Sequence, residues 1–397
     1  MKVLQINAVY GYASTGTIAK DIGDCAEKNG MQSYTACQRS SLSGDHIYRV
    51  GNILDWKLHA LFTRLTGRQA FFSKLPTRKL LLWMEEINPD IVHLHNVHSN
   101  FVNLQLVCDY CRQKDIPLVL TLHDCWFFTG KCTHFVKTGC DRWQIGCGNC
   151  SQLKMEVPCL FGDPTAKVFQ EKLAALNSVP KLYVVGCSKW ITECAKLSGL
   201  KAKEYITISN GVDTQVFTPK DSAFAKENDL NDRFVILGMA NKWVEPENRP
   251  GVVKLLKTLN PDYRVVIVGC SEEDKTFFEA FPNVLTVPFI KDSKQLADIY
   301  NAANVFVNLT RADTLPTVNV ECICCGTPVI TFDACGSPEL VDESSGIVIP
   351  VGDFDGLLAA IEQIAGQPMN YDVAQKQRMF SKDTSYLQYV QLYNAMQ

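Results

Sequence analysis

The chain has 397 residues, of which 46% are hydrophobic and 20% are charged, and its formal net charge is −3. This length predicts two or three domains with sizeable cores, and the small net charge gives no indication of a nucleic-acid-binding protein. No apolar run approaches the roughly 20 residues that cross a bilayer. Residues 1–8 are typical of a first β-strand rather than a signal peptide, so we expect a cytoplasmic protein.

Apolar segments of strand length alternate with amphipathic helical patterns along the whole chain. Unbroken apolar strands are typical of parallel sheets covered on both faces, and helices between them imply right-handed βαβ units. Because the strands are too many for one sheet, we expect an α/β protein with two doubly wound, Rossmann-like domains facing a cleft. The predicted strands are 2–8, 90–96, 117–123, 182–187, 233–240, 263–269, 284–289, 305–310 and 328–332, and predicted helices include 17–29, 101–113, 188–198, 293–302 and 353–365.

The loop between the first strand and helix 17–29 contains Gly11 and Gly16. Gly16 lets the backbone approach a ligand closely, and the start of a helix attracts an anion. The spacing differs from the dinucleotide-binding G-x-G-x-x-G fingerprint. The loop is therefore either a phosphate contact or a simple tight turn.

Residues 55–79 interleave basic side chains with large apolar ones, among them Lys57, Arg64, Leu58, Leu61 and Phe62. A basic amphipathic segment is typical of a protein that docks on a membrane surface. A solvated helix face above an ordinary core stripe explains the same pattern, and both interpretations stay open.

Histidines gather near the ends of two predicted strands. His93 and His95 fall on one face of strand 90–96, and with His98 they could suggest a metal site. We favour acceptor contacts from Asn96 and His98, which lie just past the strand end. His123 ends strand 117–123, where it is either poised over a binding crevice or purely structural.

The chain has seventeen cysteines, which is many for a reducing compartment in which disulfides are rare. Five of them follow the pattern Cys125-x6-Cys132-x7-Cys140-x6-Cys147-x2-Cys150, and the last pair has the spacing of a metal knuckle. We expect a structural Zn²⁺ on Cys132, Cys140, Cys147 and Cys150, with His134 in reserve. Buried free thiols and disulfides are the alternatives.

We place a domain boundary in the polar region that follows residue 200. The first domain is predicted at 1–205 with a Cys-rich insertion at 125–159, and the second domain at 206–375. A helix is predicted at 376–397, where four large side chains fall at helical spacing: Tyr386, Tyr389, Leu392 and Tyr393.

The segment from Arg311 to Ile330 is the most informative part of the chain. Asp313 follows the strand 305–310, and Glu321 lies about two turns into a helix that ends at Gly326. Loops at the carboxyl ends of parallel strands are where open α/β sheets bind ligands, and the helix start there suits phosphate. The alternative is that Glu321 simply solvates a helix face.

This segment resembles the acidic pair of the GT-B glycosyltransferases of family 4, in which seven residues separate two acids. The resemblance continues through Gly326-Thr-Pro-Val-Ile330 to Gly336-Ser-Pro-Glu339. It implies that Asp313 contacts the donor sugar and Glu321 the nucleotide ribose. The resemblance implies further contacts with the donor at Gly16, Asn241, Thr314, Leu315 and Pro316.

The resemblance also implies that His123 lies by the donor sugar. We favour Asp124 as its hydrogen-bonding neighbour, on the acceptor side. The C-terminal helix is expected to return to the first domain. Similar sequences carry Arg-Lys-Gly shortly after a Trp, whereas this chain has three extra residues and Pro250 in place of the Lys. Lys242 or Arg249 is expected to substitute in stabilising the departing diphosphate.

Together these features predict a retaining glycosyltransferase with His123, Asp313, Lys242 and Arg249 as catalytic residues and no cofactor required for catalysis. We expect a UDP- or GDP-sugar donor, a polyprenyl-diphosphate-linked glycan acceptor, and peripheral attachment to the inner face of the cell membrane, in capsular or exopolysaccharide synthesis. The alternatives are a non-catalytic glycan-binding or partner module of the same fold and a nucleotide-sugar epimerase.

Overall fold

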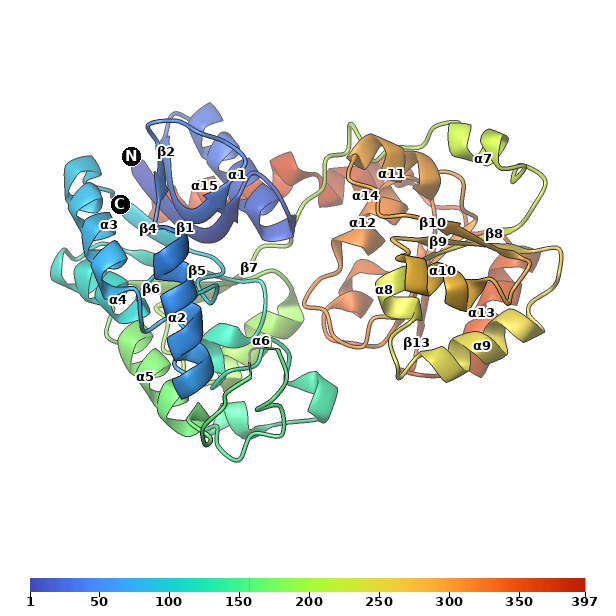
Figure 1. Cartoon of the computed structure of the whole chain (residues 1–397). Coiled ribbons are helices and arrows are strands. Elements are labelled where there is room, and N and C mark those ends of the chain that lie inside the picture. The colour runs from blue at the N-terminus through green and yellow to red at the C-terminus, as the bar shows by residue number, and fades with distance from the viewer. Residues whose placement is uncertain (157, 397) are drawn as a thin grey trace. The chain divides into compact units, whose positions relative to one another are not determined.

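The computed structural model describes residues 1–156 and 158–396, which divide into two compact units. The first unit contains residues 1–210 and the chain from Ser385 onward, and the second contains Gly211–Thr384. Each unit is a parallel β-sheet with helices on both faces (Figure 1). The predicted α/β class with two doubly wound domains is confirmed.

The first unit is built on seven parallel strands in the order β3-β2-β1-β4-β5-β6-β7. They are β1 (Lys2–Tyr10), β2 (Gln32–Ser40), β3 (Ile47–Arg49), β4 (Ile91–Leu94), β5 (Leu118–Leu122), β6 (Leu182–Gly186) and β7 (Glu204–Thr207). The sequence did not predict β2, β3 or β7. β2 mixes polar and apolar residues, and β3 and β7 are short edge strands, so none forms an apolar run. The predicted domain boundary between residues 205 and 206 falls inside β7.

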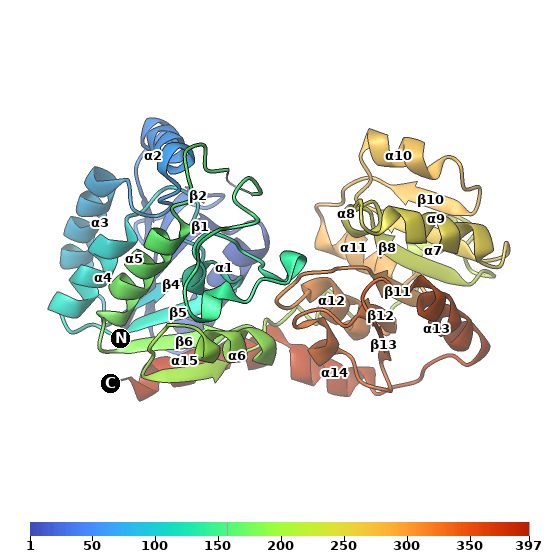
Figure 2. The same cartoon turned by 90° about the horizontal axis from the view of Figure 1, so that it is seen from below.

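Helices cover both faces of this sheet. Figure 2 shows α3, α4 and α5 together on one side, while α1 and the C-terminal helix α15 share a hydrophobic cluster with the other face. α2 begins at a capping box formed by Asn52 and Asp55 and ends at Gly67, whose φ of 67° is the left-handed conformation typical of a helix end. The helices are α1 (Ser14–Lys28), α2 (Ile53–Thr66), α3 (Lys74–Ile87), α4 (Leu104–Gln113), α5 (Thr165–Asn177) and α6 (Lys189–Leu197).

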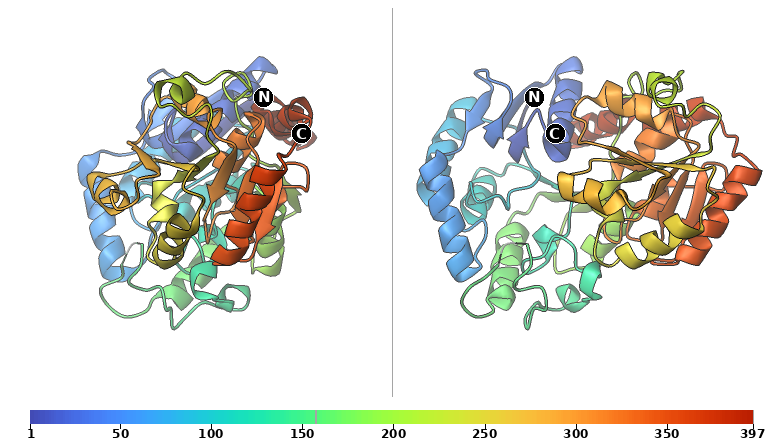
Figure 3. Two further views of the ribbon diagram at one scale, coloured as in Figure 1. Left: turned by 90° about the vertical axis from the view of Figure 1, so that its right-hand side faces the viewer. Right: turned by 45° about the vertical axis from the view of Figure 1, so that its right-hand side comes forward.

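The C-terminal helix α15 (Lys382–Ala395) joins the first unit from Ser385 onward. Tyr386, Tyr389 and Tyr393 are almost fully buried in the cluster beneath the sheet. Both chain ends consequently lie on the first unit (Figure 3). The expected return of the C-terminal helix is observed, but its predicted start at residue 376 lies within α14 (Val373–Phe380), which belongs to the second unit.

The second unit has six parallel strands in the order β10-β9-β8-β11-β12-β13. They are β8 (Val235–Met239), β9 (Arg264–Val268), β10 (Val284–Val287), β11 (Val305–Asn308), β12 (Val329–Phe332) and β13 (Gly346–Ile349). The helices are α7 (Ala223–Glu227), α8 (Ala240–Trp243), α9 (Arg249–Thr258), α10 (Glu272–Phe278), α11 (Ser293–Tyr300), α12 (Thr317–Cys324) and α13 (Phe354–Gly366) with α14. One hydrophobic cluster joins α8, α9, α10 and α13 to a single face of the sheet.

The predicted insertion contains three short 3₁₀ helices, η1 (Trp126–Phe128), η2 (Val136–Thr138) and η3 (Arg142–Gln144), joined by loops. Aromatic side chains hold it together, since Phe135 stacks on Trp143 with ring centroids 4.6 Å apart and both are buried. Within the residues described, no helix is long and apolar enough to cross a membrane.

Candidate active site

The chain reverses direction across the second sheet between β8 and β11, which lie side by side although β9 and β10 separate them in sequence. At such a switch point the loops after the two strands diverge and leave a crevice at the carboxyl edge of the sheet. The segment after β8 carries Asn241 and Lys242, and the loop after β11 carries residues 309–316. The topology therefore brings the predicted donor-binding segments to one edge.

Glu321 lies on α12, directly after this second loop. Its carboxylate accepts a hydrogen bond of 2.9 Å from the Tyr300 hydroxyl, which comes from α11. Burial raises the pKa of Glu321 to about 7, and the Tyr300 hydrogen bond opposes part of that rise. A carboxyl group held half-ionised near neutral pH is ready to accept hydrogen bonds from ligand hydroxyls. Its partner shows that Glu321 does more than solvate a helix face.

Asp313 organises the loop between β11 and α12. Its carboxylate accepts the Leu315 N–H at 3.1 Å, and its backbone carbonyl accepts the Gly336 N–H at 3.3 Å from the loop after β12. Thr314 and Leu315 are buried, and Pro316 immediately precedes α12. The loop thus presents its backbone beside the first turn of a helix, where N–H groups lack partners within the helix.

The two candidate cations have different surroundings. Lys242 forms an ion pair with Glu245, with Nζ 3.2 Å from the carboxylate oxygen. Arg249 begins α9 and lies over the Phe277 ring at 4.9 Å, and its buried Nε has no hydrogen-bond partner in the structure. Pro250 occupies the first turn of α9, where no backbone N–H is needed, so the unexpected proline leaves the helix intact.

Sequence reasoning missed Asn248 and Arg311, which join the two loops. The buried Asn248 amide donates to the carbonyls of Lys242 and Leu309, both at 2.9 Å, and its oxygen accepts from Arg311 Nε at 2.7 Å. The available signal was an asparagine directly before the candidate cation Arg249. This bridge fixes the loop after β8 against the loop after β11.

The first sheet has an equivalent switch point between β1 and β4. Asn7 connects its two loops: its amide nitrogen donates to Thr15 O at 3.0 Å, and its oxygen accepts the Asn96 N–H at 3.2 Å. Gly16 packs so tightly that a Cβ there would stand 3.1 Å from the Val9 backbone. Gly16 and Asn96 therefore lie at the same edge of the first sheet.

His98 and Asp124 form a partly buried pair in the first unit, with His98 Nε2 3.0 Å from the carboxylate of Asp124. Burial opposes ionisation of Asp124, but His98 and the Trp126 N–H outweigh it and lower its pKa. A cavity of about 220 Å³ lies beside the pair, and its lining is polar: Gln69, His98, Lys131, Thr133 and Glu156.

His123 follows β5, and its imidazole Nε2 lies 3.0 Å from Nδ1 of His95. Burial lowers the pKa of His123 to about 4, although the nearby Asp124 opposes the shift. The imidazole is therefore neutral at physiological pH. His93 bonds Tyr393 and Thr121 within the core, so the considered grouping of His93, His95 and His98 as metal ligands is not formed.

Cys132, Cys140, Cys147 and Cys150 all line one small cavity in the insertion. None of the seventeen cysteines forms a disulfide in the structure, so the disulfide alternative is not observed. Across residues 1–156 and 158–396, no three His, Cys, Asp or Glu side chains are grouped so as to hold a metal ion. The zinc assignment stays a prediction, and the shared cavity is its structural support.

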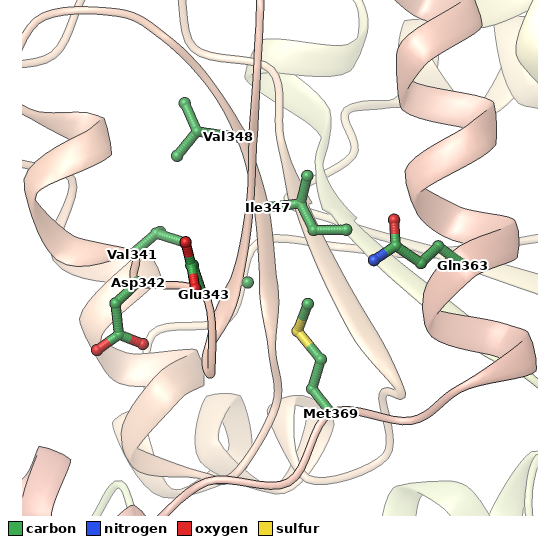
Figure 4. A pocket seen from close by; sticks show the side chains of 8 residues that line it. Val341, Asp342, Glu343, Ile347, Val348, Gln363 and Met369 are labelled. Atoms are coloured by element: carbon green, nitrogen blue, oxygen red, sulfur yellow. The ribbon is translucent and has the colours of Figure 1, made fainter.

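A cavity of about 490 Å³ in the second unit contains none of the predicted residues (Figure 4). It lies beside the start of the edge strand β13, away from the carboxyl edge of the sheet. Asp342 at its rim is paired with Lys376, which lowers the Asp342 pKa. Its lining comprises Val341, Asp342, Glu343, Gly346, Ile347, Val348, Gln363 and Met369.

Models of known protein families match both units of the chain. A model for glycosyl transferases of group 1 matches residues 220–383, and a model for glycosyltransferase family 4 matches residues 17–148. The chain belongs to the family 4 glycosyltransferases. Its two switch points thus belong to the two domains of a GT-B glycosyltransferase.

Individual relatives agree with this membership. The putative colanic acid biosynthesis glycosyl transferase WcaC of Escherichia coli K12 is 24% identical over 384 residues, covering 87% of this glycosyltransferase and 86% of WcaC. Sucrose-phosphate synthase of Thermosynechococcus elongatus has the same fold, with a TM-score of 0.69 and 17% identity over 100% of this chain and 98% of that one. HepE of Anabaena, solved with UDP, matches with a TM-score of 0.68 and 14% identity over 100% of both chains.

Proposed function

We propose that this glycosyltransferase moves a sugar from a nucleotide-sugar donor to a lipid-linked glycan with retention of the anomeric configuration. The Glu321–Tyr300 pair at the switch point of the second unit carries the proposal. A carboxylate there can accept both ribose hydroxyls of a nucleotide. HepE of Anabaena, which shares this fold, binds UDP and UDP-glucose, and this supports a nucleotide-sugar as the donor here, either a UDP-sugar or a GDP-sugar.

The donor sugar is assigned to the loop organised by Asp313, with Thr314 and Leu315 as neighbouring contacts and the first turn of α12 near its diphosphate. Arg249 is the preferred cation for the departing diphosphate, since its Nε lacks a partner while Lys242 is paired with Glu245. Positive charge and helix N-termini stabilise such a leaving group without a metal. Asn241 is exposed and Gly16 lies in the first unit, and their donor contacts stay predictions.

In the proposed reaction the bond between the anomeric carbon and the diphosphate oxygen breaks. A bond from the acceptor oxygen forms on the same face of the sugar, and the acceptor proton passes to the departing phosphate. No protein base is needed for this route, so the protein's part is positioning and electrostatic stabilisation. His123, neutral and at the carboxyl edge of the first sheet, is assigned to a sugar hydroxyl.

The acceptor is assigned to the polar cavity next to His98. Asp124 holds the His98 imidazole, and Asn96 lies at the neighbouring strand end. Hydroxyl-rich glycans suit such a lining because each wall residue offers a hydrogen-bond donor or acceptor. The similarity to WcaC favours an exopolysaccharide repeat unit as the product.

We propose that the exposed side of α2 binds a membrane surface. Ile53, Leu54 and Leu61 are exposed on this helix, with side chains between 50% and 62% accessible, and Lys57 and Arg64 are exposed among them. The loop containing Leu160 and Phe161, both exposed, is attached to the helix by the Leu160 N–H, which donates to Arg64 O at 2.8 Å. Exposed apolar side chains flanked by basic ones suit an anionic bilayer that carries the polyprenyl-linked acceptor.

A thermal-shift panel tests the donor assignment. UDP, GDP, ADP, CMP and their sugars are compared on wild type and Glu321→Ala, because a ligand raises the melting temperature according to its concentration over Kd. We expect one nucleotide to stabilise the wild type and not the variant. Absence of any shift would favour the non-catalytic module, and conversion of the sugar on an intact nucleotide would favour an epimerase.

A further inference from the structure

Three side chains of the first unit form a hydrogen-bond chain that ends at His123. Gln5 Nε2 donates to Ala19 O at 2.8 Å, and Gln5 Oε1 lies 2.9 Å from His95 Nε2. His95 Nδ1 then lies 3.0 Å from His123 Nε2. Gln5 and His95 are at most 1% exposed, so water does not compete for these contacts. This series of hydrogen bonds runs from α1 through β1 to the carboxyl ends of β4 and β5.

The direction of every hydrogen bond in this chain is fixed by its first member. A backbone carbonyl only accepts, so the Gln5 nitrogen faces Ala19 and the Gln5 oxygen faces His95. The Gln5 oxygen also only accepts, so His95 carries its hydrogen on Nε2. If His95 is neutral, its Nδ1 bears a lone pair, and the hydrogen shared with His123 must come from His123 Nε2.

The surroundings keep both imidazoles neutral. Burial holds the pKa of His95 well below its usual range, and the neighbouring His93 and His123 lower it further. Burial likewise lowers the pKa of His123 to about 4, with Asp124 opposing and His98 adding to the shift. His93 stacks on His95 with centroids 4.0 Å apart but directs its nitrogens to Tyr393 and Thr121, so it does not compete for the chain.

The fold makes room for the first link. Gly23 of α1 faces Gln5, and a Cβ there would stand 3.1 Å from Gln5 Nε2 and 2.7 Å from Ser33 Oγ. A helix interior ordinarily disfavours glycine by roughly 1 kcal/mol relative to alanine. The close approach of the amide to the helix backbone explains why glycine occupies this position.

We propose that Gln5 and His95 are positioning residues that hold His123 as the Nε2–H tautomer, so that its Nδ1 accepts a hydrogen bond from a hydroxyl of the bound sugar. The sugar part of this inference rests on the proposed function, whereas the hydrogen-bond direction does not. An acceptor nitrogen at that place favours sugars with a neutral hydroxyl and repels a carboxylate, so hexoses are preferred over uronic acids.

Nitrogen NMR on the full chain with ¹⁵N-labelled histidine tests the hydrogen-bond direction without any substrate. At pH 7.5 we expect His123 to be protonated at Nε2 only, with a coupling across the hydrogen bond to His95 Nδ1. Signals are assigned by their loss in His95→Asn and His123→Asn. A hydrogen on His95 Nδ1, or a doubly protonated His123, would overturn the proposal.

Activity of paired variants tests the positioning role. His95→Leu removes the acceptor for His123, and we expect roughly a tenfold fall in kcat with little change in the donor KM. His95→Asn supplies an amide oxygen near the lost Nδ1 and should recover most of the rate. Equal losses in two variants that melt like the wild type would contradict the positioning role.

The half-buried His123 offers a second pair that does not disturb the core. In His123→Asn the amide lies near the position of Nδ1, and in His123→Gln near the position of Nε2. We expect Asn to retain at least several-fold more activity than Gln, and the reverse order would refute the role of Nδ1. If no nucleotide-sugar is turned over by the wild type, the proposed function fails while the NMR result still decides the tautomer.

Discussion

Tyr300, the last residue of α11, donates its hydroxyl hydrogen over 2.9 Å to the carboxylate of Glu321 on α12, and this bond joins the two helices that precede and follow β11. The hydrogen bond favours the ionised carboxylate, while burial favours the protonated acid and prevails, raising the pKa of Glu321 to about 7. The protonation of Glu321 should therefore change near neutral pH.

Donor affinity should depend on pH through Glu321. Ribose hydroxyls donate best to an ionised carboxylate, so affinity should rise up to about pH 7, level off above it, and fall by up to about tenfold per unit below it. The diphosphate of a nucleotide-sugar does not titrate in this range. Calorimetry from pH 5.5 to 8.5 measures the profile. Tyr300→Phe should move the midpoint upward, and an unchanged profile in Glu321→Gln would contradict the assignment.

The same group should affect the stability of the unliganded protein with the opposite sign. The unfolded chain loses this proton near pH 4.5 and the folded chain near pH 7, so the contribution of Glu321 to stability falls as pH rises through that window. Glu321→Gln should gain melting temperature relative to wild type at pH 8 and lose that gain at pH 4.5. A constant difference across the range would show that the carboxyl is not shifted.

Arg249 should matter more than Lys242 for catalysis. Replacing Arg249 by Met removes a cation with an unpartnered Nε, and we expect kcat/KM to fall by roughly 10- to 100-fold. Lys242→Met removes a charge already neutralised by Glu245 and should cost less than tenfold. Steady-state kinetics on both variants decide the order, with melting temperatures as the folding control. The opposite order would assign the diphosphate to Lys242.

Membrane attachment should depend on the apolar residues of α2. The double variant Leu58→Ser with Leu61→Ser should lose most binding to vesicles rich in anionic lipid at low salt, because both side chains are exposed beside Lys57. Phe289→Ser, which changes a side chain 79% exposed in the second unit, is the matched control. Vesicle flotation measures the bound fraction, and equal flotation of both variants would exclude α2 as the docking surface.

The cysteine cavity predicts one zinc ion per chain. Four thiols line the cavity, and burial raises the pKa of Cys132, Cys147 and Cys150, although the Gly130 N–H that donates to Cys147 Sγ at 3.1 Å opposes the rise at Cys147. A zinc ion binds thiolates, so it would displace these thiol protons when it binds. Elemental analysis of protein purified without chelator should find zinc, which Cys147→Ser should lower and Cys194→Ser in α6 should not. Zinc-free wild type would leave buried thiols as the explanation.

The sequence predicted the local structure around Asp313 and Glu321 better than the hydrogen-bond network of the first unit. Asp313 and Glu321 sit in a short local motif, whose strand, loop and helix follow from apolar patterns and from Gly326 at the helix end. Gln5 and His95 come into contact only because β1 pairs with β4, and these strands are far apart in the sequence. No local sequence pattern predicts such a contact. β2 was missed for a related reason, since its partly polar sequence becomes a strand by pairing with β1.

Hydrolysis of the donor nucleotide-sugar, followed by ¹H NMR, tests the central claim most directly. The account predicts release of nucleoside diphosphate together with a sugar that first appears in the donor's own anomeric configuration, and loss of both products in Glu321→Ala. Initial appearance of the opposite anomer, or an altered sugar still attached to its nucleotide, would contradict a retaining glycosyltransferase.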